Sequence, residues 1–287
     1  MKSKKNKIKK KFIKLRCSPK TKKKGYTCYS DESLLKLKKF WNARHPDATI
    51  NTNNSFEIWQ KLRNSLSNVC ESESCWLKQK FISNNLDKNL LNYTFAPKAP
   101  ESWKKDKNTW LSSIDIEKVM KQYEDAFPNF AFIGPSPIDF DTPKVYNTCV
   151  WDDLCKFNLS SFIKKNKTNI GIIFNTDPHY KGGSHWVGMY IDLKKQIIFY
   201  FDSVGDAIPN EILKLVKKIQ IQGKELGLDL KFDSNYKFDH QKGNTECGMY
   251  VLYFIIEVLE NKKDLNFFKT NRITDEQMED YRKIFFN

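Results

Sequence analysis

The chain has 287 residues and a formal net charge of +15, from 49 Lys and Arg against 34 Asp and Glu. No apolar run approaches about eighteen residues, and the first residues lack the apolar centre of a signal peptide, so we expect neither a membrane span nor secretion. The length suits a catalytic domain of ordinary size with an extension.

The positive charge is concentrated at the N-terminus. Residues 1–24 contain thirteen Lys or Arg and no acidic residue, which leaves only about two net positive charges for the rest of the chain. We expect residues 1–25 to form a basic, disordered arm. One interpretation is a solubilising tail or a nuclear-import signal. The other is DNA binding through 1–24, by phosphate contacts without base specificity.

A helical region is expected over residues 26–100. One helix starts after Ser30 and ends at His45, and a second follows Asn54, each with one apolar face. A third helical piece starts at Cys70. The apolar faces consist of Leu34, Leu37 and Trp41 in the first helix and of Trp59, Leu62, Leu66 and Val69 in the second.

The cysteines are odd in number and irregularly spaced, which without an export signal predicts reduced thiols in an intracellular protein. Cys70 and Cys75 are close enough to begin a metal site, but no second Cys/His pair of suitable spacing follows, so we expect no metal. The full set is Cys17, Cys28, Cys70, Cys75, Cys149, Cys155 and Cys247.

Residues 101–287 are expected to form the catalytic core, because strand patterns now alternate with helical ones. The first helix of this core carries Ile116 and Tyr123 and ends before Pro128. Residues 145–157 are expected to be extended or irregular. The expected strands are 130–133, 170–174, 186–191, 196–201 and 228–232, and the further expected helices are 209–226 and 248–259.

Four polar residues stand at spacings that suit nucleophilic catalysis. His185 follows a Gly-Gly-Ser loop, Asp202 lies seventeen residues later, and Gln241 precedes Cys247 by six positions. A thiol is weakly nucleophilic at neutral pH unless an imidazole takes its proton, and a carboxylate fixes the tautomer of that imidazole. The sequence predicts a cysteine hydrolase with His185, Asp202 and Cys247 as triad and Gln241 as oxyanion donor.

The expected local structure brings these residues together. The strands joined by the turn at 192–195 are antiparallel, so His185, ahead of the first, and Asp202, after the second, should meet. Cys247 begins an apolar helix, whose dipole favours the thiolate and whose backbone N–H groups can face an oxyanion. Gly248 allows substrate to approach that turn closely.

Each residue also has an ordinary structural interpretation. A lone Cys before an apolar helix is more often a small core residue, and Asp202 with Ser203 is typical of a simple turn. His179 lies in the same loop as His185 and is the rival base, whereas His240 is interpreted as a loop residue. The prediction therefore depends on the joint arrangement.

This order of residues resembles the clan of ubiquitin-like-protein-specific (SUMO) proteases and the adenovirus maturation protease. The shared features are His-Trp, an Asp seventeen residues after that His, and a Gln six before Cys-Gly. Residues 110–116 are also similar to the Trp-Leu-x-Asp-x-x-Ile segment that opens the SUMO protease core. Ser113 stands where that segment has Asp. The contact that the Asp carboxylate makes with the substrate tail in the SUMO proteases is therefore not expected from Ser113.

The chain resembles the polyprotein-processing proteases of African swine fever virus and related giant DNA viruses more closely, over about residues 70–287. The swine fever enzyme has Asn where this chain has Asp202, and a carboxylate should orient His185 at least as well. The similar motifs are Asn175-Thr176-Asp177, His185-Trp186, His240-Gln241-Lys242, Thr245-Glu246-Cys247-Gly248, Ile273-Thr274-Asp275-Glu276 and, outside the core, Cys70-Glu-Ser-Glu-Ser-Cys75.

The resemblance implies an α+β fold of the adenain/SUMO-protease type, a mixed sheet with a central helix carrying the nucleophile, plus the N-terminal helical extension. It implies cleavage after small residues, commonly after Gly-Gly, in a cleft walled by Trp110 and Trp186. The alternative for both indoles is aromatic core. No cofactor is implied, although DNA or a peptide could act as activator.

The implied function is that of a cysteine endopeptidase of a large DNA virus, acting on structural polyproteins with Gly-Gly-X sites during virion maturation. The protein is expected to be located in the viral factory of the host cytoplasm and in the virion. No membrane partner is expected. One alternative keeps the fold and removes ubiquitin or SUMO from host proteins. Another is a nucleic-acid-binding virion protein with an inactive protease core.

Overall fold

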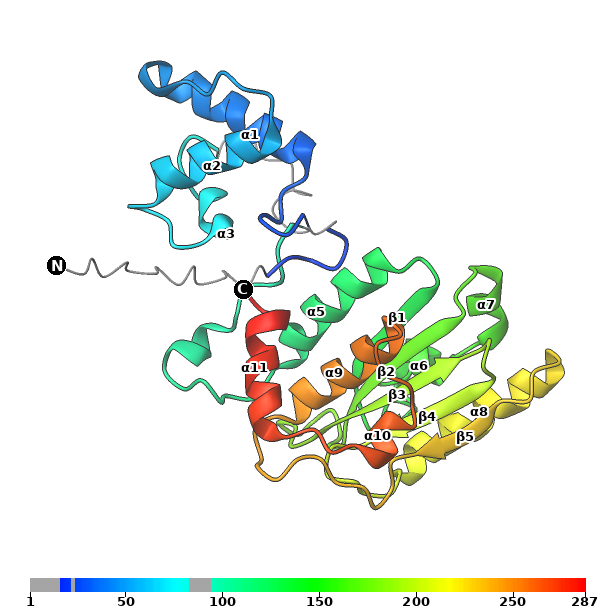
Figure 1. The fold of residues 1–287 in the computed structure, drawn as a ribbon. Helices are drawn as coiled ribbons and strands as arrows, with labels where there is room; N and C mark the ends of the chain where they lie inside the picture. The colour runs from blue at the N-terminus through cyan, green and yellow to red at the C-terminus, as the bar shows by residue number, and fades with distance from the viewer. Residues whose placement is uncertain (1–15, 22–23, 83–93) are drawn as a thin grey trace. The chain divides into compact units, whose positions relative to one another are not determined.

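The structure is a computed structural model that describes residues 16–21, 24–82 and 94–287. It divides into two compact units, Met1–Phe95 and Ala96–Asn287, each of which is described by itself (Figure 1). The expectation of disorder for residues 1–15 lies outside the described residues.

The first unit contains helices α1 (Asp31–Arg44), α2 (Ser55–Leu66) and the short α3 (Glu73–Trp76), with a 3-10 turn at Pro46–Ala48. The side chains of Ser30 and Asn54 cap α1 and α2 by accepting a backbone N–H of the first turn. Both expected helices are confirmed. Val69 was expected on the apolar face of the second, but it lies beyond α2 and is 63% exposed.

The carboxylate of Glu73 joins the elements of this unit. It accepts hydrogen bonds from Trp59 Nε1 at 2.5 Å, Thr27 Oγ1 at 2.9 Å and the Cys28 backbone N–H at 3.1 Å. The hydroxyl of Tyr29 donates to the backbone carbonyl of Glu73 at 2.8 Å. Burial raises the pKa of Glu73 above its ordinary value, and the three hydrogen bonds to the carboxylate offset part of that shift.

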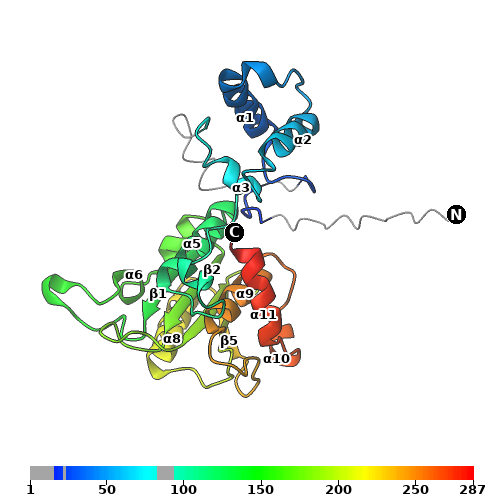
Figure 2. The same cartoon turned by 90° about the vertical axis from the view of Figure 1, so that its left-hand side faces the viewer.

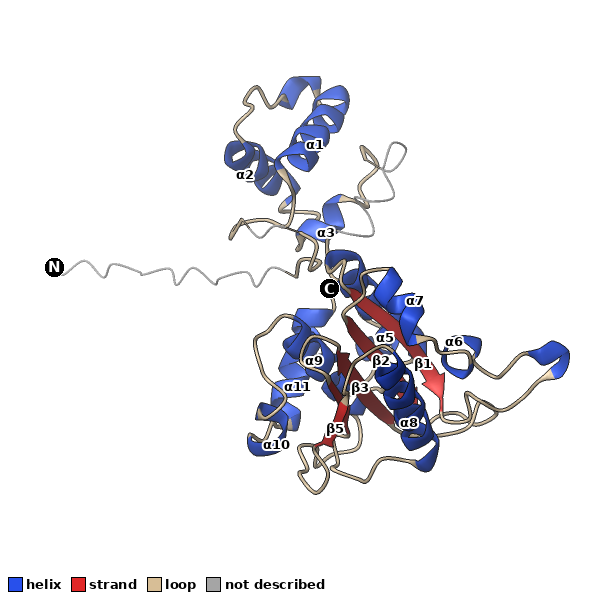
Figure 3. Cartoon of the chain, turned by 90° about the vertical axis from the view of Figure 1, so that its right-hand side faces the viewer, coloured by secondary structure: helices blue, strands red, loops and turns tan. Residues whose placement is uncertain are grey.

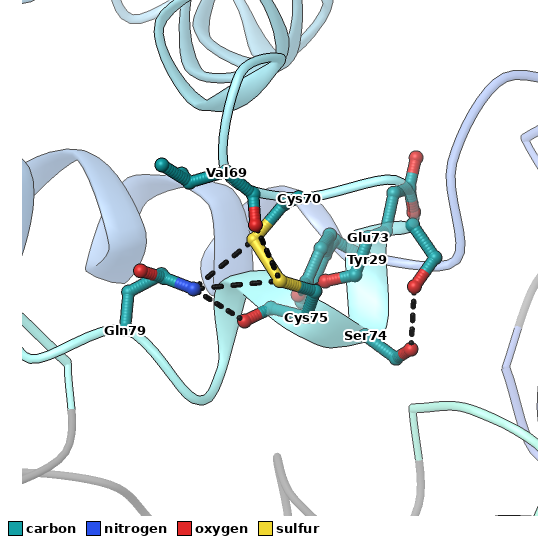
Figure 4. The surroundings of a disulfide bond; sticks show 8 residues. Tyr29, Val69, Cys70, Glu73, Ser74, Cys75 and Gln79 are labelled. Atoms are coloured by element: carbon teal, nitrogen blue, oxygen red, sulfur yellow. Dashed lines mark hydrogen bonds between the residues drawn. A yellow bond between two sulfur atoms is a disulfide. The ribbon is translucent and has the colours of Figure 1, made fainter.

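Six of the seven cysteines form disulfides: Cys17–Cys28, Cys70–Cys75 and, in the second unit, Cys149–Cys155. The expectation of reduced thiols is wrong for these six, because local turns bring each pair together across 11, 5 and 6 positions. Beside the second pair, Gln79 Nε2 donates to Cys70 Sγ at 3.1 Å (Figure 4). Cys247 is free and buried.

The expected disordered arm is wrong for residues 16–21. Cys17 is disulfide-bonded and forms an isolated antiparallel bridge with Phe95. Ser18 is fully buried, and its backbone N–H donates to Thr94 O at 3.1 Å. These contacts fix the segment to the first unit, so the compact structure starts well before residue 25.

A five-stranded mixed sheet, in the order β1-β2-β3-β4-β5, forms the centre of the second unit. The pairs β1–β2 and β4–β5 are parallel, whereas β3 is antiparallel to both β2 and β4. The expected strands are confirmed, except that the last begins at Lys231 rather than at Leu228. The strands are β1 (Phe130–Pro137), β2 (Asn169–Asn175), β3 (Trp186–Asp192), β4 (Ile197–Phe201) and β5 (Lys231–Ser234).

Helices cover both faces of this sheet. Successive side chains of a strand point to opposite faces, so Phe199 and Phe201 of β4 pack with residues of α5, α9 and α11. Ile198 and Tyr200 pack with residues of α8 on the other face. Figures 1 and 2 show α11 outside α9, and Figure 3 shows α8 along the sheet. The helices are α5 (Ser113–Ala126), α6 (Asp152–Cys155), α7 (Leu159–Lys164), α8 (Asn210–Glu225), α9 (Cys247–Leu259), α10 (Phe267–Thr270) and α11 (Asp275–Phe285), with 3-10 turns at Glu101–Lys104 and Val145–Asn147.

Helix α9 is the central helix of the core. Each of its thirteen residues is buried, including Glu257, as expected for a helix with apolar residues on all its faces. Phe254 stacks on Phe201 of the sheet with 4.8 Å between ring centroids, and Phe268 meets Phe254 edge-on at 5.1 Å. No helix in the described ranges is both long and apolar enough to cross a membrane.

Residues 96–100 were expected in the N-terminal helical region, but they belong to the second unit. The backbone N–H of Ala99 donates to Asn287 O at 2.9 Å, and the backbone N–H of Asn287 donates to Pro97 O at 2.7 Å. Backbone pairing with the last residue therefore attaches this segment to the core.

Replacing Phe254 with Ala is expected to lower the free energy of unfolding by about 3–5 kcal/mol, because the lost ring leaves a cavity at the centre of the core. Urea unfolding followed by near-UV circular dichroism measures this change. Ile221→Ala is the matched control, since Ile221 is 60% exposed on α8. A loss no larger than that of the control would contradict the central role of α9.

Candidate active site

The hairpin of β3 and β4 positions His185 and Asp202. His185 immediately precedes β3 and Asp202 immediately follows β4, so the antiparallel register brings both to the same edge of the sheet. Nε2 of His185 lies 2.8 Å from Oδ1 of Asp202. The side chain of Asp202 is 4% exposed and that of His185 is 21% exposed. The expected meeting of the two residues is confirmed.

Cys247 is the first residue of α9 and is 2% exposed. Its thiol lies close enough to His185 to help raise the pKa of the imidazole, together with Asp202. The positive end of the α9 dipole lies at this sulfur and favours a negative charge there. The arrangement can therefore hold a thiolate beside an imidazolium.

The charge state of His185 follows from these contacts. Burial by itself would lower the pKa of His185, but hydrogen bonds to Asp202 and Cys247, and the charges of these groups, raise it to about 10. The imidazole is therefore protonated at neutral pH, which is the state that stabilises a neighbouring thiolate.

Asn235 fixes the backbone of Asp202. Its Nδ2 donates to Asp202 O at 2.7 Å and to Phe238 O at 2.9 Å, and its Oδ1 accepts the Asp202 backbone N–H at 2.9 Å. The Val204 backbone N–H donates to Asp202 Oδ1 at 2.9 Å. Because Asn235 is 1% exposed, water does not compete for these bonds and the carboxylate keeps one orientation.

Ser203 links the Asp202 turn to Gln241. Its Oγ donates to Gln241 Oε1 at 2.7 Å, and its carbonyl accepts the backbone N–H groups of His240 and Gln241, both at 2.8 Å. Nε2 of Gln241 donates one hydrogen bond to Gly243 O at 2.9 Å. The amide of Gln241 is thus oriented by two partners, and its nitrogen carries a second N–H.

The first residue of α11, Asp275, holds the loop that follows Gln241. Oδ2 of Asp275 accepts the backbone N–H groups of Lys242 at 3.0 Å and Gly243 at 2.8 Å. Oδ1 of the same carboxylate accepts from Tyr250 OH at 2.9 Å. The Ile273–Glu276 motif therefore has a structural explanation, because it supports the loop between Gln241 and the nucleophile candidate.

His240 lies in a loop, as expected, but it is fully buried rather than solvent-facing. Its Nε2 lies 2.9 Å from Phe268 O, and its Nδ1 accepts the Ile273 backbone N–H at 3.2 Å. These two bonds select the neutral tautomer with a proton on Nε2. His240 thus connects the chain beside Gln241 to the segment before α11.

A buried ion pair lies next to Cys247. Arg282 donates from Nε and Nη2 to the two carboxylate oxygens of Glu246, at 2.8 and 2.7 Å. The side chains of Arg282 and Glu246 are 5% and 2% exposed. Nη1 of Arg282 also donates to the backbone carbonyl of Thr109 at 2.9 Å, directly before Trp110. One guanidinium therefore joins the start of α9 to the segment that carries Trp110.

A pocket of about 560 Å³ borders this site. Trp110 and Trp186 both line it, but Trp110 is 41% exposed whereas Trp186 is 8% exposed and donates its indole N–H to Leu111 O at 3.0 Å. Ser113, which replaces the expected Asp, is also in the lining. The other lining residues include Ser112, Pro135, Ser136, Pro137, Lys144, Val150, Trp151, Asn175, Asp177, Pro178, His179, Lys181 and Ser184.

The rival base, His179, has a different partner. Its Nδ1 lies 2.7 Å from Asp139 Oδ2, and its backbone N–H donates to Asp139 Oδ1 at 2.9 Å. Burial alone would raise the pKa of Asp139, but the hydrogen bonds and charge of His179 lower it below its ordinary value. His179 lines the pocket and is paired with Asp139, whereas His185 is the histidine whose pKa Cys247 affects.

Several residues that build the site gave no signal in the sequence. Asn235 and Arg282 are 33 and 36 positions from their partners Asp202 and Glu246, so no local spacing connects them. Glu246 carried a weak signal, since a carboxylate before a strongly apolar helix needs a partner when it is buried. Within the described ranges, no group of three or more His, Cys, Asp or Glu residues is arranged to hold a metal ion.

The C-terminal part of the chain is similar to a known protease family, and most of the chain is similar to viral proteases. Residues 156–287 match the Ulp1 protease family, C-terminal catalytic domain. A thiol protease of Acanthamoeba polyphaga mimivirus is 27% identical over 284 residues, which cover 92% of this chain and 90% of that protein. A SUMO-1 cysteine protease of African swine fever virus is 27% identical over 239 residues, which cover 76% of this chain and 83% of that protein.

The crystal structure of the African swine fever virus protease has the same fold. It matches with a TM-score of 0.72 and 21% sequence identity, over 95% of both chains. The expected α+β fold and the resemblance to this group of proteases are confirmed.

Replacing Asp202 with Asn is expected to lower the pKa of His185 by at least about one unit, because the charge that favours the imidazolium is lost. The His185 ring should then lose its proton well below the wild-type value of about 10. NMR titration of the histidine ring carbons reads this directly. His179 is the internal control, since Asp139 pairs with it in both proteins. An unchanged His185 titration would show that other groups hold its proton.

Proposed function

We propose that this chain is a cysteine protease that processes structural polyproteins of a large DNA virus by cutting after Gly-Gly. The observation that carries the proposal is the grouping of Cys247 with His185, which is hydrogen-bonded to the buried Asp202, beside a pocket lined by two indoles. Similarity to a mimivirus thiol protease over 92% of the chain supports the viral setting.

In the proposed reaction the Cys247 thiolate attacks the carbonyl carbon of the residue before the scissile bond. The negative charge on the tetrahedral oxygen is stabilised by the free N–H of the Gln241 amide and by the backbone N–H of Cys247. The His185 imidazolium then gives its proton to the leaving amine, and a thioester remains. Water, deprotonated by His185, hydrolyses the thioester and restores the thiol.

The preference for glycine follows from the crowding around the start of α9. A Cβ on Gly248 would lie 3.0 Å from the Leu111 Cβ and 3.3 Å from Cδ1 of Trp186. Leu111 and Trp186 therefore press closely on the turn that carries the nucleophile, with Trp110 on the adjoining pocket wall. We infer that a substrate backbone without side chains fits beside this turn best.

Cys247→Ala is expected to abolish cleavage of viral structural polyproteins, because no other group replaces the attacking sulfur. The experiment incubates candidate capsid polyproteins with each protein and identifies new termini by mass spectrometry. Ile221→Ala controls for purification and handling. New termini after Gly-Gly that persist with Cys247→Ala would discard the assignment.

The same experiment separates the alternatives. Fusions of ubiquitin or SUMO to a reporter, cut in preference to polyproteins, would indicate an isopeptidase acting on host modifiers. If the wild type cuts neither substrate and Cys247 does not react with a glycine-ending electrophile, a nucleic-acid-binding virion protein with an inactive core would be indicated. A protein active in the viral factory and the virion should instead cut polyproteins.

We also propose that the basic N-terminal segment binds DNA and that DNA can act as an activator. Deleting residues 1–15 removes eight lysines but keeps Cys17 and its disulfide to Cys28. The deletion is expected to weaken DNA binding and to reduce the slope of log K against log salt, by about 0.9 for each phosphate that those lysines neutralise in the full chain. Fluorescence anisotropy over a salt series measures both. An unchanged slope would reject this role.

A further inference from the structure

A hairpin between β1 and α6 forms one side of the pocket. We call residues 140–151 the pocket hairpin; it projects from the second unit in Figures 2 and 3. The backbone N–H of Trp151 donates to Phe140 O at 3.0 Å, and that of Val150 donates to Thr142 O at 3.0 Å. The disulfide Cys149–Cys155 secures its base. The hairpin is therefore an ordered element.

The backbone at the tip of the pocket hairpin has a conformation that is unfavourable for Tyr146. Tyr146 and Asn147 have φ values of 59° and 60°, the pattern of a tight type I′ hairpin turn between Val145 and Thr148. Asn and Gly tolerate these angles, whereas a bulky side chain at positive φ raises the conformational energy. The hydroxyl of Thr148 donates to Val145 O at 2.8 Å and supports the turn.

The side chains at this tip face solvent. Tyr146 is 94% exposed and Val145 is 74% exposed. Neither packing nor turn preference explains a tyrosine at that position, because Asn there would suit the turn better. A residue that is unfavourable for folding and fully exposed points to a role in binding.

A second loop that lines the pocket, around Tyr180, also carries an exposed aromatic side chain. Tyr180 is 74% exposed and stands between His179 and Lys181, which both line the pocket. The bond between His179 and Asp139 attaches this loop to the residue preceding the pocket hairpin. Tyr146, Val145 and Tyr180 are the three most exposed large hydrophobic side chains of the described residues, and all three belong to these two loops.

We propose that Val145, Tyr146 and Tyr180, which we call the pocket rim, bind the folded part of the protein substrate while the pocket holds its extended segment. This inference rests on the proposed function and concerns the same site. Lys144 and Lys181 line the pocket beside the rim residues. The substrate surface that fits is therefore an apolar patch bordered by carboxylates.

Aromatic and apolar side chains outside the reacting centre contribute binding energy that a short peptide cannot use. The rim should thus act on whole proteins and not on short peptides that carry the scissile sequence alone. This difference separates a docking surface from a structural role, since a folding defect would reduce cleavage of both substrates.

The test is Tyr146→Asn in the full chain, compared with wild type on a polyprotein and on a short peptide with the same Gly-Gly-X site. Asn tolerates the positive φ, so the melting temperature should not fall. The kcat/KM for the polyprotein is expected to fall about tenfold or more, mainly through KM, with the peptide unchanged within about twofold. Tyr180→Ser should act in the same direction. Ile221→Ser, which removes an exposed apolar side chain from α8, is the matched control.

Equal kinetics of Tyr146→Asn and wild type on the polyprotein would overturn the docking role, and so would an equal loss on polyprotein and peptide. Both results leave the proposed polyprotein cleavage intact, because the wild type still cuts the polyprotein. A wild-type enzyme that cuts the peptide but no polyprotein would overturn the proposed function, and the docking role with it.

Discussion

The hydrogen bond between His185 and Asp202 is the interaction on which the site depends. It exists because the β3–β4 hairpin ends at one edge of the sheet, and it fixes which ring nitrogen is left for Cys247. A carboxylate that is 4% exposed loses most of its hydration, so it must be bonded within the protein. The Val204 backbone N–H and His185 supply bonds to the carboxylate, and Asn235 holds the backbone of Asp202.

The remaining parts of the site are held from the C-terminal end of the chain. Asp275, at the start of α11, accepts the backbone N–H groups of the two residues after Gln241. His240, which precedes Gln241, accepts the backbone N–H of Ile273. Arg282 of α11 holds Glu246 beside the nucleophile candidate. Removing one partner of a buried ion pair costs about 3–5 kcal/mol, so α11 stabilises the geometry as well as the fold. The candidate triad residues lie at strand ends and at the start of α9. The loops that connect these elements are held by residues from the C-terminal end of the chain.

The sequence indicated the sheet, the central helix and the catalytic candidates, because periodicity and motif spacing are local properties. The meeting of His185 with Asp202 was predictable, since a hairpin fixes which strand ends coincide. The roles of Asn235 and Asp275 were not, because their contacts join segments that no pattern connects. The loop position of His240 was predicted, but its burial was not, because the segment that covers it lies about thirty residues away in the sequence. The disulfides were missed because local turns, rather than a recognisable spacing, bring the cysteines together.

The contacts of Arg282 with Glu246 and Thr109 have a consequence for how such enzymes diverge. One guanidinium touches the residue before the nucleophile and the backbone before a wall of the substrate pocket. A lineage that changes Glu246 alone leaves a buried cation without its counter-ion, so viable descendants should change positions 246 and 282 as a pair. New substrate preferences should therefore arise more readily through pocket residues away from the contacts of Arg282, where substitutions do not disturb the nucleophile.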